Sequence, residues 1–105
     1  MCASQPLSRE ALADLRRELK RSRDVFGPDA ARRMGARLAR SLSMIATGTA
    51  LGHRHPLLHD APPSFRCITV APLLIIFNAD TNAVLTIVDG RRDIAAVVTE
   101  RVRRS

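Results

Sequence analysis

Two apolar stretches near the end of the chain, Leu73–Phe77 (LLIIF) and Val84–Val88 (VLTIV), decide the fold. The polar segment Asn78–Asn82 (NADTN) lies between them, and two apolar runs joined by a turn-rich segment predict a β-hairpin. Runs that are apolar at nearly every position favour strands that are covered on both faces or lie at the centre of a sheet. The second run continues into Asp89–Asp93 (DGRRD), so the sequence predicts two arginines at a fixed place after the last strand.

Two helices are predicted in the first half of the chain. Ser8 is a suitable N-cap, Glu10 follows in the first turn, and leucines then recur three or four residues apart, which predicts a helix at about 8–21. Gly27 and Pro28 interrupt this pattern, and Pro28 suits the first position of a second helix at about 28–46. The two segments predict a helical hairpin with a basic outer surface.

The remaining segments complete an α+β fold. Residues 47–64 contain glycines, prolines and histidines without a sustained period and are interpreted as a long loop or a short irregular strand. The apolar spacing in the C-terminal segment, 94–105, suits a last short helix or an extended tail. We therefore predict a two-helix hairpin packed on a small antiparallel sheet within one domain, 1–105. Its strands are expected at about 65–70, 73–78 and 83–88.

Length and composition restrict the class of protein. A chain of 105 residues, 46% of them apolar, suits one domain with a modest core. The longest apolar run, Val70–Phe77, is interrupted by Pro72 and is too short to span a membrane. The first six residues do not resemble a signal peptide, so we expect a cytoplasmic protein. Cys2 and Cys67 are too few for a disulfide framework or a zinc site, and Cys67 is predicted to be a core residue.

The charge balance indicates an anionic partner. The net charge is +7, from 17 Lys and Arg against 10 Asp and Glu, and nearly all the cations are arginines. Because arginine pairs with carboxylates and with phosphates, the partner could be an acidic protein or a nucleic acid. Three Phe and no Tyr or Trp leave little surface for stacking unpaired bases, which argues against a single-strand-binding platform.

The loop before the first strand gathers His53, His55, His59 and Asp60. Three or four such side chains could bind a metal ion only if they converged, and the spacing does not require this. The histidines could also act as acid and base in RNA cleavage, although nothing in the sequence fixes the phosphate. The simplest interpretation is a set of solvated loop histidines. The sequence predicts no metal site and no cofactor.

Arg91 and Arg92 are the strongest candidates for contact with a partner, because a strand end on a rigid sheet presents them together. The competing interpretation is a solvated strand end in which Asp93 pairs with one arginine. The basic face of the second helix is interpreted as an ordinary solvated surface. Nucleophilic catalysis has little support, because the serines and threonines show no glycine elbow.

Taken in order, these segments resemble the RelE/ParE superfamily of type II toxins. The similarity covers roughly Leu7 to Val98 and is most specific at the apolar hairpin and the Gly-Arg-Arg-Asp segment after it. The motifs that carry it are Leu7-Ser8-(x)2-Ala11-(x)2-Asp14-Leu15, the Gly-Pro that opens the second helix, Gly52 with Leu57, Leu73–Phe77, and Val88-(x)-Gly90-Arg91-Arg92-Asp93.

The resemblance implies one of two activities. Members of the mRNA endonuclease branch carry an arginine in the third strand and a tyrosine in the tail, and Leu74 and about Val97 occupy those positions here. A phosphate clamp and a proton-transfer group are therefore missing. This departure favours the ParE-like branch, whose members poison DNA gyrase through protein contact, although Asp89 stands where that branch often has histidine. The target-binding residues would then be Arg91 and Arg92.

The resemblance also implies a cognate antitoxin, of the ribbon-helix-helix type, that lays an amphipathic and acidic segment over the helices and sheet. We expect it to contact an apolar rim formed by Leu12, Leu15, Met34 and Leu38. Family members open with a β-strand before the first helix, and here that strand is predicted to be short or missing.

Two alternative functions stay open at this point. The first is a ribosome-dependent mRNA endonuclease that uses His53, His55, Arg66 and Arg91. The second is a non-toxic basic adaptor that binds nucleic acid electrostatically, with a steep dependence on salt.

Overall fold

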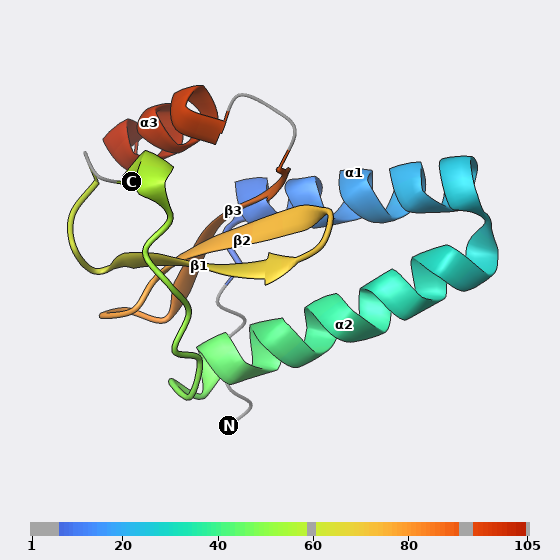
Figure 1. Cartoon of the computed structure of the whole chain (residues 1–105), viewed down its shortest axis with the longest axis horizontal. Coiled ribbons are helices and arrows are strands. Elements are labelled where there is room, and N and C mark those ends of the chain that lie inside the picture. Colours follow the sequence, from blue (N-terminus) through green and yellow to red (C-terminus); the bar gives the residue numbers. More distant parts are fainter. Residues whose placement is uncertain (1–6, 59–60, 91–93, 105) are drawn as a thin grey trace.

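A computed structural model describes residues 7–58, 61–90 and 94–104 of the chain. Helices α1 (Arg9–Phe26) and α2 (Pro28–Ala46) form a V-shaped hairpin on one side of a three-stranded sheet, and helix α3 lies on the other side (Figure 1). This arrangement confirms the predicted α+β class with helices packed on a small antiparallel sheet. The elements after α2 are a 3-10 turn, η1 (Pro56–Leu58), the strands β1 (Phe65–Val70), β2 (Leu73–Asn78) and β3 (Ala83–Asp89), and α3 (Ile94–Arg104).

The local sequence explains both ends of α1. The hydroxyl of Ser8 accepts a hydrogen bond from Ala11 N at 3.1 Å, which satisfies one of the free N–H groups of the first turn. The helix continues to Phe26, past the predicted end at Arg21, because residues 22–26 contain no helix breaker. Gly27 ends it with a φ of 97°, a conformation that favours glycine. Pro28 then opens α2 at the predicted place.

The sheet is an antiparallel meander in the order β1-β2-β3, with β2 at the centre. Ile75 of β2 lies opposite Ile68 of β1 and Ile87 of β3, and a register shift interrupts the second pairing between Ile76 and Phe77. Residues 73–77 of β2 are all buried. The uninterrupted apolar run is therefore explained by a central strand that is covered on both faces.

Alternate residues of β2 belong to two separate cores. Leu73, Ile75 and Phe77 pack against α1 and α2 in what we call the hairpin core, together with the buried Ala11 and Leu38. Leu74 and Ile76 point to the opposite face and join the α3 core. The other buried members of the α3 core are Leu58, Cys67, Val88, Ile94 and Val98.

Several interpretations left open by the sequence are resolved in the structure. The segment after residue 93 is a helix, and its Ile94 and Val98 are buried against the sheet. Cys67 is 0% exposed, which confirms it as a core residue. The loop before β1 contains η1 and a single antiparallel bridge between His53 and Cys67. Ahead of α1, Leu7 makes a single parallel bridge with Val84 of β3.

Candidate functional site

The end of β3, where Arg91 and Arg92 follow, is fixed by two kinds of contact. Gly90 N donates a hydrogen bond to Pro72 O at 2.9 Å, which ties the end of β3 to the turn between β1 and β2. The carboxylate of Asp89 is buried and accepts a bond from Arg21 Nη1 of α1 at 3.2 Å. The strand therefore ends at a defined position against α1. Arg91, Arg92 and Asp93 themselves lie outside the described residues.

The chain after these arginines is also tied to α1. Arg101 of α3 donates from Nη1 to Asp14 Oδ2 at 2.9 Å and from Nη2 to Asp14 Oδ1 at 3.1 Å. The same Nη1 donates to Leu85 O at 3.1 Å, so one side chain joins α3, β3 and α1. We call the Asp14–Arg101 and Arg21–Asp89 pairs the two clamps. Together they hold β3 and α3 on one helix, α1.

The electrostatics of the Asp14 clamp follow from its partners. Burial by itself raises the pKa of the Asp14 carboxyl, because the charged form loses its water. Hydrogen bonds from Arg101, Thr86 and the backbone of Ile87, with the charge of Arg101, outweigh that effect and lower the pKa below its ordinary value. The bonds to Asp14 likewise raise the pKa of Arg101. Both groups are thus ionised at neutral pH and form a charged pair with one partner only 1% exposed.

A cleft lies between α1 and α2 where the hairpin passes the β1–β2 turn. Its volume is about 280 Å³, near the lower end of ligand-binding pockets and suited to one or two side chains. Arg21 and Pro72, which hold the end of β3, also line this cleft, so it shares two residues with the contacts of Asp89 and Gly90. We call it the arginine-rimmed cleft. Its other lining residues include Glu18, Phe26, Arg33, Met34, Arg37 and Leu73.

The structure separates the residues of the proposed RNA-cleaving set. His53 Nε2 lies 3.6 Å from Cys67 Sγ, whereas Arg66 Nε donates to Leu51 O at 2.9 Å. Because Arg66 and Cys67 are neighbours in β1, their side chains leave opposite faces of the sheet. The guanidinium of Arg66 is thus engaged with the loop backbone and does not share a contact with the ring of His53. His55 is half-buried in the same loop, and Arg91 is outside the described residues.

The residues expected to bind an antitoxin are not equally accessible. Leu38 is 1% exposed and belongs to the hairpin core, so in this fold it presents almost no surface to a partner. Leu15 and Met34 are partly buried against the same core, and Leu12 is half-buried on α1. Met34 also lines the arginine-rimmed cleft.

The metal interpretation of the histidine loop has no further support. Within the described residues, no group of three His, Cys, Asp or Glu side chains could hold a metal ion. His59 and Asp60 lie outside those residues. Arg54, from the same loop, donates to three backbone carbonyls, those of Ala61, Pro62 and Phe65, at 2.6 to 2.9 Å. Arg54 therefore holds the loop together through bonds to its own backbone.

Sequence reasoning missed the clamps, although part of the signal was present. Asp14 and Glu18 occupy positions three and seven residues after Ala11, on the stripe of α1 that faces the core, and both are buried. A carboxylate at such a position requires a buried partner. The order of charged residues along the chain does not show which residue that partner is. Arg21 and Arg101 each stand among several other cations in the sequence, and nothing there marks them as partners of a buried carboxylate.

In comparisons with known proteins, no family model and no curated protein sequence matches this chain. No helix in the described part of the chain is long and apolar enough to cross a membrane.

Proposed function

We propose that this chain is the toxin of a type II toxin–antitoxin system of the ParE-like branch, which acts in the cytosol and arrests growth by poisoning DNA gyrase through protein contact. The observation that carries this proposal is that α1 holds the two elements between which the arginines stand in the sequence, β3 through the Arg21–Asp89 pair and α3 through the Asp14–Arg101 pair. Cationic residues next to rigidly held elements suit contact with a fixed acidic surface. The single parallel bridge of Leu7 to Val84 also agrees with a very short first strand ahead of α1.

A second consideration favours protein contact over RNA cleavage. Leu74 occupies the place at which the endonuclease branch carries its third-strand arginine, and here it is 7% exposed in the α3 core. A cation at that position would be buried among apolar side chains. The separation of Arg66 from His53 by the plane of the sheet points the same way.

Neutralisation by a cognate antitoxin belongs to the same proposal. The partly exposed Leu12, Leu15 and Met34 give α1 and α2 an apolar rim, and the net charge of +7 suits an acidic segment. Leu38 contributes to this surface only as support beneath it, because its own side chain is buried.

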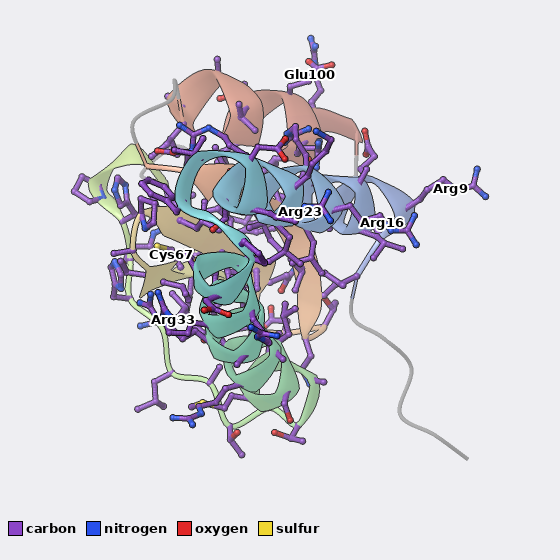
Figure 2. All side chains as sticks on the ribbon, turned by 90° about the vertical axis from the view of Figure 1, so that its right-hand side faces the viewer. Arg9, Arg16, Arg23, Arg33, Cys67 and Glu100 are labelled. Atoms are coloured by element: carbon purple, nitrogen blue, oxygen red, sulfur yellow. The ribbon has the colours of Figure 1, made fainter. Side chains whose placement is uncertain are left out.

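The proposal is tested with purified gyrase by following DNA supercoiling and the accumulation of cleaved DNA as the protein is added. We expect dose-dependent inhibition that is lost when Arg91 and Arg92 are both replaced by alanine. The matched control is the Arg9→Ala/Arg16→Ala pair, which removes the same charge from exposed side chains on α1 that project away from the body of the molecule (Figure 2). Equal effects of the two double variants would contradict a specific role for the arginine pair.

Other outcomes distinguish the alternative functions. Folded protein that leaves gyrase untouched, yet cleaves translated mRNA in a manner that depends on His53 or His55, would replace the proposal with the endonuclease. Salt-sensitive binding to nucleic acid without growth arrest would replace it with the adaptor.

A further inference from the structure

We propose that the arginine-rimmed cleft binds an acidic peptide segment of the target protein by inserting one large apolar side chain between α1 and α2. This inference rests on the proposed function only for the identity of the target protein. The binding of an acidic, apolar-anchored segment by the cleft follows from the structure of the cleft.

The walls of the cleft are apolar and open to solvent. Met34 and Leu73 lie on its inner side, and Phe26 at the tip of the helical hairpin is 66% exposed. Val25 beside it is 59% exposed, so two large apolar side chains are exposed to solvent at the C-terminal end of α1. Exposed apolar groups of this size next to a concavity are typical of interaction sites. A volume of about 280 Å³ accepts a leucine or phenylalanine side chain, whereas most cofactors need more space.

The rim of the cleft carries three arginines, from both helices. Arg33 makes no ion pair within residues 7–58, 61–90 and 94–104, and Figure 2, which views the molecule toward the hairpin tip, shows it on α2. Arg37 donates to the carbonyl of Ala71 at 3.3 Å, and Arg21 is shared with Asp89. Arg33 and Arg37 therefore retain donors for carboxylates that flank an inserted apolar residue.

One lining residue of the cleft, Glu18, adds a hydrogen-bond acceptor to it. Glu18 is 4% exposed, and Arg17 Nε, at 3.8 Å, is the only cation within ion-pair distance of it in the described part of the chain. That distance is too long for a hydrogen bond, and in the described residues no fully buried side-chain oxygen lacks a partner, so the Glu18 carboxylate reaches solvent and can accept a donor from a ligand. A peptide provides backbone N–H groups there, an apolar side chain for the walls and carboxylates for the rim.

The cleft shares residues with the contacts that hold the end of β3. Arg21 and Pro72 line the cleft and also bond to Asp89 and Gly90, so a partner that contacts the end of β3 at these residues also meets the cleft. A second copy of this chain is a poor occupant, because two surfaces of net charge +7 repel each other. The structure thus favours an acidic segment of a different protein.

The first test uses a blocked, fluorescein-labelled peptide, Asp-Glu-Glu-Leu-Phe-Glu-Asp, as the probe and fluorescence anisotropy as the readout. We expect Arg33→Glu to weaken binding at least tenfold and Arg32→Glu to weaken it no more than twofold. Arg32 is the matched control because it gives the same charge change one residue away, is 76% exposed, pairs with Asp29 and does not line the cleft. A probe with alanines in place of Leu-Phe should also bind at least tenfold more weakly.

Two results would overturn the cleft as a peptide site. Equal weakening by Arg33→Glu and Arg32→Glu would show general charge attraction, and equal binding of the two probes would show that no apolar side chain is inserted. Displacement of the peptide by a DNA oligonucleotide, with equal sensitivity to both variants, would replace the peptide with a nucleic acid. Circular dichroism of each variant verifies that the fold is retained.

The second test assigns the partner. If gyrase is inhibited by the wild-type protein, Arg33→Glu should weaken the inhibition at least tenfold and Arg32→Glu should not. Unchanged inhibition by Arg33→Glu would overturn the target as the occupant. If the wild-type protein does not inhibit gyrase, the proposed function fails, and the peptide experiment still decides whether the cleft binds an acidic segment.

Discussion

Replacement of Arg101 by methionine should destabilise the protein strongly, because methionine keeps much of the apolar stem but leaves Asp14 without its main partner. Breaking a buried ion pair by removing one partner costs about 3–5 kcal/mol. Asp14 is 1% exposed, so its charge cannot recover water where it lies. It does keep the bond from Thr86 Oγ1 at 2.8 Å and the exposed Arg17 at 3.0 Å, which places the expected loss at the lower end, about 3 kcal/mol.

Urea unfolding monitored by circular dichroism measures this loss. With a slope of about 1.5 kcal/mol per M, the midpoint should fall by about 2 M while the slope stays unchanged. Arg103→Met is the matched control on α3. The Arg103 side chain is 75% exposed and pairs with Glu100 at the surface, so its removal should cost less than about 0.5 kcal/mol. Equal midpoints for the two variants would refute the clamp as an energetic contact.

The pH dependence of the same pair gives an independent check with a definite sign. The pKa of Asp14 is lower in the folded protein than in the unfolded chain, where it is about 3.9. The unfolded chain therefore takes up the proton first as the pH falls, so the stability that Asp14 contributes is present above about pH 4 and is lost below it. In Arg101→Met the bonds and the charge that lower this pKa most are gone, so the folded variant takes up the proton at a higher pH than folded wild type. The unfolded chains titrate alike, so the stability difference between wild type and Arg101→Met should shrink between pH 7 and pH 3.5. A constant difference over this range would contradict the ionised pair.

Three further outcomes are expected from the loop and the α3 core. Gly52→Ala should lower the stability by about 2 kcal/mol or more in a thermal or urea melt, because Gly52 has a φ of 60° and an added Cβ would lie 2.9 Å from the ring of Phe77. Cys67 should react with a maleimide much more slowly in the folded than in the unfolded protein, since burial raises the pKa of its thiol to about 11, and mass spectrometry of its peptide separates it from Cys2. Arg54→Met should speed amide exchange in the loop that this side chain spans, with a global loss of about 1–2 kcal/mol, and unchanged exchange there would count against its structural role.

The elements that were predictable are those that local sequence determines. Gly27 and Pro28 separate the two helices, and the uninterrupted apolar run at 73–77 indicates a strand that is covered on both faces. The end of α1 was predicted too early because a cluster of cations was taken as a helix end, although the helix continues until Gly27 allows a positive φ. The last segment was ambiguous because four spaced residues fit either a short helix or a tail. Its packing on the sheet decides between them.

The candidate site was only half predictable. The arginine pair could be proposed because its position after a strand is a local feature, and it stays a prediction. The clamps could not, because Asp14 and Arg101 are 87 residues apart, and Arg21 and Asp89 are 68 apart. Only the tertiary fold selects such pairs from the many charges of a basic chain. The arginine-rimmed cleft likewise depends on the angle between two helices and on the turn beside them, which no short segment specifies.

The two cores on opposite faces of β2 have a genetic consequence. A damaging substitution at Ile75 should be repaired by second-site changes in α1 or α2, because its side chain belongs to the hairpin core. One at its neighbour Ile76 should be repaired instead from η1 or α3, on the other side of the sheet. Second-site suppressors of substitutions at Ile75 and at Ile76 would therefore fall into two separate groups, although the two residues are adjacent in the chain. The map of compensating mutations would trace the two faces of the sheet residue by residue.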